Sequence, residues 1–357
     1  MFPETAPTKT KLTLGLQRGA WLCRECLERI VMKYAFSVAL LAALSFLAAC
    51  AGQPGMQPSS LGSLPSVSSR AGVPAASPLA QLANLDYSNG SITVFSIENG
   101  RAKVTKTFSP GHGIAQGLAM DGAGRIYTTV TASDSKPCAA SVEVFSNTGR
   151  FIERLDAPIL KGAPGAPSLT DVAVDRHSNV YVSDFGQQAV YFYPGAHKTK
   201  SPTIVVQNSQ NAASVLSTPN GANVVVSGGC GFASVRPYTR TSSGQYTPGS
   251  CFGIGTIALI GGAIDDLVDV MTPVDGVPGL VSVSSPNGGE TFHTPGRLAS
   301  ISGVAFNGDA SIAYVADHTN ERVLAFRRPA SGWLSGQPKL VARYRGFQNL
   351  DIIAVPR

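Results

Sequence analysis

The sequence predicts an all-β protein, specifically a β-propeller of six four-stranded blades closed by its N- and C-terminal strands, with seven blades as the alternative. Three observations lead to this fold class: a repeated strand–turn–strand unit, a repeat spacing close to the size of one blade, and complementary halves of a blade at the two ends of the domain. The region after the leader shows no helical period, which agrees with an all-β chain.

The repeated unit is a short apolar strand, a turn and a second strand that often ends in aspartate. It is clearest at residues 117–129, 171–184 and 303–317. Weaker copies begin at Val215 and Leu267, and a half-copy begins at Ile353. Successive copies are 37 to 54 residues apart, which fits the roughly 40–50 residues that one four-stranded blade needs.

The two ends of the predicted domain complement each other. Residues 91–95 and 103–108 form outer strands without an inner strand before them, and residues 351–356 form an inner strand without outer strands after it. We therefore expect both ends to build one blade together, which closes the ring and removes open sheet edges.

The best-preserved unit runs from Thr170-Asp171-Val172 through Asn179-Val180-Tyr181 to Asp184 and Tyr191. It resembles an NHL repeat and, more broadly, the SMP-30/gluconolactonase-like propellers, over nearly all of residues 80–357. The resemblance implies a propeller but leaves its function open, because such propellers include binding modules, hydrolases and lyases. Enzymes of the SMP-30-like group hold a metal with a glutamate near an inner strand, and no glutamate lies on a recognisable inner strand here.

The first 79 residues have the composition of a leader and a tether. An apolar run at 35–49 follows Lys33, and Leu47-Ala48-Ala49-Cys50 resembles a bacterial lipobox, with an ordinary secretory signal as the alternative. We expect a signal peptide over 1–49, of which 1–31 is an upstream mis-start in one interpretation, and acylation of Cys50. A Pro/Gly/Ser-rich tether over 50–79 then leads to the propeller at 80–357.

These features predict a place in the bacterial cell envelope. The residue after Cys50 is alanine, which by the lipoprotein sorting pattern indicates the outer membrane. Much of the net charge of +6 comes from the leader, and the rest of the chain has no basic run or basic–aromatic stripe. We therefore expect no nucleic-acid partner, but a monomer that contacts the membrane through its lipid anchor and binds a protein or small-molecule ligand.

Aspartates at strand ends form the candidate ligand or cation site. In a propeller, the starts of inner strands and the ends of second strands lie on one face, over the central channel. The residues expected there are Asp171, Asp266 and Asp351 at strand starts, and Asp184, Asp317 and His318 at strand ends. Their carboxylates could hold a divalent cation such as calcium. The competing interpretation is that Asp184 and Asp317 form turns by accepting backbone N–H bonds.

The remaining features limit the possible functions. Cys230 and Cys251 fall in one blade and are expected to form a disulfide in an oxidising envelope, with Cys138 as a competing partner. The sequence identifies no cofactor and no catalytic motif, so it favours a lipid-anchored binding or scaffold module. The alternative is a cation-dependent, lactonase-like hydrolase or lyase with its site at the channel mouth.

Overall fold

In a computed structural model of the chain, the described residues are 79–111, 113–131, 140–195, 201–207, 209, 212–228, 230, 233–254, 261–274, 279–293, 300–334 and 336–357. The predicted signal peptide, Cys50, nearly all of the tether and Cys138 lie outside them. The described residues form strands and turns without any helix. Accordingly, a search of these residues finds no helix long and apolar enough to cross a membrane.

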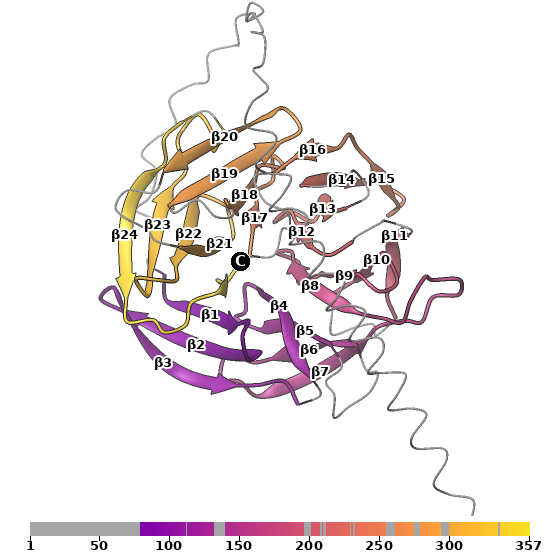
Figure 1. The fold of residues 1–357 in the computed structure, drawn as a ribbon, viewed down its shortest axis with the longest axis horizontal. Coiled ribbons are helices and arrows are strands. Elements are labelled where there is room, and N and C mark those ends of the chain that lie inside the picture. The colour runs from indigo at the N-terminus through magenta and orange to yellow at the C-terminus, as the bar shows by residue number, and fades with distance from the viewer. Residues whose placement is uncertain are drawn as a thin grey trace, which may run out of the picture. The chain divides into compact units, whose positions relative to one another are not determined.

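In the described residues, six blades of antiparallel strands are arranged around a central axis, which confirms the predicted β-propeller (Figure 1). Two neighbouring blades join at their outer strands into one eight-stranded sheet. In each blade, the strands are named from the axis outward. The first blade contains β25 (Ile352–Ala354), β1 (Gln81–Asp86), β2 (Ser91–Glu98) and β3 (Arg101–Phe108), and the second contains β4 (Ile114–Met120), β5 (Ile126–Thr131), β6 (Ser141–Phe145) and β7 (Phe151–Asp156). The third contains β8 (Leu169–Val174), β9 (Val180–Asp184), β10 (Ala189–Tyr193) and β11 (Thr203–Gln207).

The fourth blade contains β12 (Val215–Ser217), β13 (Asn223–Ser227), β14 (Ser234–Arg240) and β15 (Tyr246–Pro248), with β16 (Phe252–Gly253) beside β14. The fifth contains β17 (Ala263–Ile264), β18 (Val270–Pro273), β19 (Leu280–Ser285) and β20 (Gly288–His293). The sixth contains β21 (Ile301–Phe306), β22 (Ile312–Asp317), β23 (Arg322–Arg327) and β24 (Lys339–Arg345). We number the blades I to VI in this order.

Burial follows the position of a strand within its blade. Every residue of β9 and of β10 is buried, because these strands are covered on both faces by neighbouring blades. The outer strand β3 is largely exposed and carries charged residues, as is common for edge strands that must not pair with other chains. The short runs of Val, Tyr and Phe in the sequence therefore mark the middle of each blade.

The two ends of the domain close the ring as expected. β25 pairs antiparallel with β1, with Ala83, Asn84 and Leu85 opposite Ala354, Ile353 and Ile352. Blade I thus contains the predicted outer strands and the C-terminal strand in one sheet. The N-terminal part supplies three strands rather than two, because β1, which was not predicted from the sequence, lies between β25 and β2.

The structure corrects the predicted start of blade V. Leu267 does not begin an inner strand, since it lies in the turn between β17 and β18 and is 64% exposed. The neighbouring Val268 has a φ of 65°, which a strand does not allow. The inner strand is only Ala263–Ile264, too short to recognise beside the apolar Leu267-Val268 pair.

The predicted disulfide between Cys230 and Cys251 is present. Their Cα atoms lie 5.9 Å apart, within the usual range for a disulfide. The link joins the segment between β13 and β14 to the segment just before β16, so it fastens the irregular outer part of blade IV.

A buried asparagine reinforces the closing strand pair. The Asn84 side chain donates a hydrogen bond to the Asn349 carbonyl (2.8 Å) and accepts one from the Asp351 backbone N–H (2.8 Å). Asn84 is almost fully buried, so no water can replace these bonds if the side chain is removed. It therefore connects β1 to the segment that delivers β25.

We predict that Asn84→Ala lowers the free energy of unfolding of the propeller by about 3 kcal/mol, because a buried donor and a buried acceptor lose their partners. Urea unfolding followed by tryptophan fluorescence measures this change. The exposed turn residue Asn147 offers a matched control, and Asn147→Ala is expected to change stability by less than about 0.5 kcal/mol. Equal effects of the two substitutions would contradict the role of Asn84 in closure.

Candidate functional site

The propeller has two faces, which the order of strands distinguishes. Each complete repeat passes from its inner strand to its second strand through a hairpin, and we call the side with these turns the hairpin face. The starts of inner strands and the ends of second strands meet on the other side, which we call the mouth face. All six candidate residues named from the sequence were expected on the mouth face.

Asp184 is fully buried at the end of β9 and has four hydrogen-bond partners. Its carboxylate accepts bonds from the backbone N–H groups of Ser168 and Gln187, the Gln187 side chain and the Tyr191 hydroxyl, all at 2.9 Å. Because every partner belongs to the fold, Asp184 shapes the turn after β9, as the turn-forming interpretation predicts.

Asp317 has the same position at the end of β22 and is also fully buried. It accepts bonds from the backbone N–H (3.3 Å) and side-chain amide (2.8 Å) of Asn320. It also pairs with the Arg322 guanidinium at 2.7 Å. These contacts occupy the carboxylate, so Asp317 likewise stabilises a turn.

Asp171 lies at the mouth face in β8 and lines the central channel. Its carboxylate accepts backbone N–H bonds from Val172 (2.9 Å) and from Val215 of blade IV (3.1 Å). On the blade II side, a Cβ at Gly117 would lie 2.7 Å from the Asp171 Cα, so the two blades pack without an intervening side chain. Burial raises the pKa of the Asp171 carboxyl to about 7, and the two N–H bonds oppose this rise only in part.

The predicted position of Asp266 is wrong. It lies in the turn between β17 and β18, on the hairpin face, and is exposed. Its carboxylate accepts the Asn220 backbone N–H at 2.9 Å, from the corresponding turn of blade IV. The cause is the misplaced inner strand of blade V, because taking Leu267 as its beginning moved Asp266 from the end of the strand to its start. Asp266 therefore cannot join Asp171 and Asp351.

Asp351 and His318 do come together at the mouth. Asp351 precedes β25, and its carboxylate accepts the Tyr87 backbone N–H (3.0 Å) and lies 3.3 Å from His318 Nδ1. The Tyr87 hydroxyl donates to Gln116 Oε1 at 2.9 Å, which extends the cluster to β4. We call Tyr87, Gln116, His318 and Asp351 the mouth cluster. It is built from blades I, II and VI.

Tyr87 and Gln116 were not predicted from the sequence, although a signal for Tyr87 is present. An aromatic residue directly follows the strand-end aspartate in three blades, as Asp86-Tyr87, Asp184-Phe185 and Asp317-His318. The backbone N–H groups of Phe185 and His318 bond Ser168 and Ser300 carbonyls, which shows that their positions correspond. Phe185 and His318 thus have equivalent backbone positions around the mouth. Tyr87 has the same place in the sequence pattern and is 49% exposed.

The channel behind the mouth is narrow, and polar and apolar surface line it about equally. Its cavity of about 50 Å³ is lined by inner strands, including Met120, Val172, Val304 and Ile352. At ~10–15 Å³ per water, this volume holds only about three to five water molecules. A ligand larger than that must bind over the mouth rather than inside the channel.

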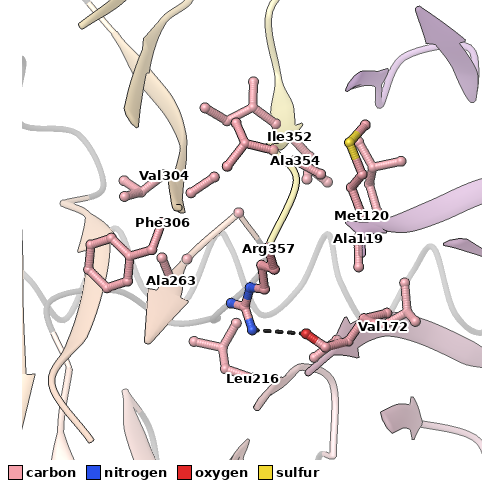
Figure 2. A pocket seen from close by; sticks show the side chains of 18 of the residues that line it. Ala119, Met120, Val172, Leu216, Ala263, Val304, Phe306, Ile352, Ala354 and Arg357 are labelled. Atoms are coloured by element: carbon pink, nitrogen blue, oxygen red, sulfur yellow. Dashed lines mark hydrogen bonds between the residues drawn. The ribbon is translucent and has the colours of Figure 1, made fainter. Parts of the chain in front are cut away.

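Arg357 crosses the channel near the hairpin face (Figure 2). Its guanidinium donates hydrogen bonds to the Val174 carbonyl (3.0 Å) and the Ser217 carbonyl (2.8 Å), which belong to β8 and β12. Desolvation lowers the pKa of Arg357 to about 10, so the side chain remains a cation at neutral pH. It ties the segment after β25 to blades III and IV.

The described residues contain no group of three or more His, Cys, Asp or Glu side chains arranged to hold a metal ion. Of the three aspartates predicted to converge, Asp171 and Asp351 have separate partners, and Asp266 is on the other face. The predicted three-carboxylate cation site is therefore not formed by these residues.

We predict that Asp171 makes the propeller less stable as pH rises. An unfolded carboxyl ionises near pH 4, whereas the folded Asp171 keeps its proton up to about pH 7, so the penalty for ionising it grows between these values. From pH 5 to pH 8 this amounts to about 2–3 kcal/mol. Urea unfolding at the two pH values is expected to show that loss in the unmodified protein.

In Asp171→Asn that part of the pH dependence disappears, since asparagine resembles the protonated carboxyl. Asp266→Asn, at an exposed carboxylate, is the control and keeps it. A pH dependence that is the same in all three proteins would contradict the buried, protonated state of Asp171.

Comparisons with known proteins support the β-propeller fold and identify no function. No family model matches the chain, and no curated protein matches it. A solved nidogen/laminin complex is similar with a TM-score of 0.50 at 14% identity, covering 77% of this chain and 97% of the other. A protein of unknown function from Bacteroides caccae has a TM-score of 0.50 at 12% identity, covering 78% and 98%. At such identities the likeness shows a shared β-propeller fold and says nothing of activity.

Proposed function

We propose that this protein is a lipid-anchored β-propeller of the bacterial cell envelope that binds a partner over its mouth face. The anchor is Cys50, acylated after removal of the leader, and the sorting pattern assigns it to the outer membrane. Several acyl chains would hold the chain on a bilayer, since each buried CH₂ contributes about 0.8 kcal/mol. Its blades are NHL-like repeats, and it acts as a monomer. Its partner is a protein or a small molecule.

The observation that carries the binding role is the mouth cluster with its aromatic positions. Tyr87, Phe185 and His318 follow strand-end aspartates whose carboxylates serve the turns. The Tyr87 side chain is 49% exposed, so part of its ring is accessible to a partner. Tyrosine is favoured at binding surfaces because it combines a large apolar ring with a polar hydroxyl. The narrow channel supports contact across the mouth rather than entry into the molecule.

The alternative, a cation-dependent hydrolase or lyase, depended on carboxylates that meet at the mouth. With Asp266 on the hairpin face, the described residues do not form the three-carboxylate group on which this alternative depended. Calcium that raised the melting temperature of the purified protein, with the rise lost in Asp351→Asn, would bring this alternative back.

The lipid anchor leads to a direct prediction. Cys50→Ala should leave the precursor unprocessed and remove acylation, because the acyl chains are attached to the cysteine thiol and to its new amino group. Mass spectrometry of the membrane fraction measures the acylated N-terminal peptide in the unmodified protein. Cys138→Ser is the matched control and should be processed normally. A Cys50→Ala chain that is still cleaved after Ala49 and remains in the membrane would contradict the anchor.

The binding role leads to a second prediction. A photoreactive amino acid placed at Tyr87 or at His318, in cells that export the chain, should form an adduct of the same mass from both positions. The exposed His177 on the hairpin face is the control position and should give no such adduct. Tyr87→Ala should lower the adduct yield from position 318 at least tenfold if Tyr87 is an anchor of the interface. Adducts from position 177 alone, or from none of the three, would contradict binding at the mouth.

A further inference from the structure

Positive charge on the outer strands is concentrated on two neighbouring strands, β3 and β24. β3 contributes Arg101, Lys103 and Lys106, and β24 contributes Lys339, Arg343 and Arg345. The four other outer strands, β7, β11, β15 and β20, together contain one basic residue, Arg154, and three acidic ones. Six exposed cations on one side therefore stand out in a chain that, after residue 49, has only three more basic than acidic residues.

The two strands form one continuous surface, which we call the basic rim. β24 of blade VI and β3 of blade I pair in parallel, with Arg345 opposite Arg101, and the Arg345 N–H donates to the Gly100 carbonyl (3.1 Å). Figure 1 shows β24 and β3 following one another along the outside of the ring. The basic rim thus runs across the junction where the ring is closed.

The charges of the basic rim are not neutralised within the described part of the chain. Other arginines have acidic partners there, such as Arg322 with Asp317 (2.7 Å) and Arg328 with Asp265 (2.9 Å). The six cations of the basic rim form no ion pair with a described residue, and the acidic residue nearest in register is Glu98, opposite Arg101. Two arginines side by side in register repel each other unless an anion lies between them.

The chain that leads to Cys50 leaves the propeller beside this surface. Leu79 is buried, and its backbone N–H donates to the hydroxyl of Tyr344 in β24 at 3.3 Å. Twenty-eight residues, 51–78, separate Leu79 from Cys50, and a chain of that length spans at most about 100 Å. These residues include no acidic side chain, so they do not screen the basic rim.

We propose that the basic rim docks on anionic lipid headgroups of the membrane that carries the acyl anchor. This inference rests on the proposed anchor at Cys50. Phosphate groups in the headgroup layer supply anions for the neighbouring Arg345 and Arg101, and each basic residue near an anionic surface strengthens attachment about fivefold. Docking here turns the side of the propeller toward the lipid and leaves the mouth face accessible from the side.

The test uses the acylated protein in vesicles, with Cys138→Ser to leave one reactive thiol in the labelled variants. A fluorophore is attached through Val104→Cys in β3 or, as a matched control, through Ile204→Cys in β11. Both positions are β-branched residues of outer strands, 46% and 40% exposed, on different sides of the ring. Spin-labelled headgroups quench the fluorophore only at close approach.

In vesicles with 30% phosphatidylglycerol we expect quenching at position 104 and at least fivefold less at position 204. Raising the salt concentration from 0.05 to 0.5 M should remove the difference in quenching between the two positions, because salt screens the attraction. The variant that combines Lys103→Gln, Lys106→Gln, Arg343→Gln and Arg345→Gln should remove it too, because the attracting charges are absent. The variant with Lys103→Arg, Lys106→Arg, Arg343→Lys and Arg345→Lys should retain it. Equal quenching at both positions, or equal quenching at position 104 in purely zwitterionic vesicles, would overturn the proposal.

Two further experiments complete the test. The first separates failure of the acyl anchor from failure of docking, and the second separates a lipid partner from a nucleic-acid partner. Flotation with zwitterionic vesicles measures attachment through the acyl anchor alone. A chain that does not float contradicts the anchor. A chain that floats but lacks the quenching pattern contradicts only the docking of the basic rim. Addition of a short DNA duplex tests a nucleic-acid partner for the same cations. Loss of quenching at equal phosphate concentration of DNA and lipid would overturn the lipid assignment.

Discussion

The pairing of β25 with β1 is the contact on which the rest of the propeller depends. Only three residue pairs form it, and they join parts of the chain about 270 positions apart. Asn84 adds two buried hydrogen bonds to the segment that delivers β25, and Arg357 extends from the end of that segment to blades III and IV. Because this pairing covers the inner edge of β1 and completes blade I, both the mouth cluster and the basic rim exist only in the closed ring.

Four buried aspartates of the described residues have a structural role. Asp121 and Asp175 accept backbone N–H bonds in the hairpin turns, just as Asp184 and Asp317 do in the turns of the mouth face. These bonds give each of the four carboxylates a role in holding its turn. Residues that the blades do not require, such as Tyr87 and His318, are therefore better indicators of function than the repeated aspartates.

The two proposed surfaces are compatible in space. The mouth cluster lies over the channel, whereas the basic rim follows the outer strands β24 and β3, so one can contact lipid while the other contacts a partner. They also differ in physical character. Aromatic rings at the mouth provide short-range contact area, and the lysines and arginines of the basic rim provide attraction that salt screens.

The sequence alone determined the propeller and its closure by both ends, because buried strands and their turns recur with a readable period. It favoured six blades over seven and a Cys230–Cys251 disulfide over a link to Cys138, and the structure decided both. Strands that are short or partly polar, such as β17 and β1, do not show that period, and the error at Leu267 placed Asp266 on the wrong face. Tertiary structure decided which side chains meet, since Asp351, His318, Tyr87 and Gln116 come from three blades and share no local pattern. It likewise brought Arg101 beside Arg345, because ring closure, rather than sequence distance, sets which strands are neighbours.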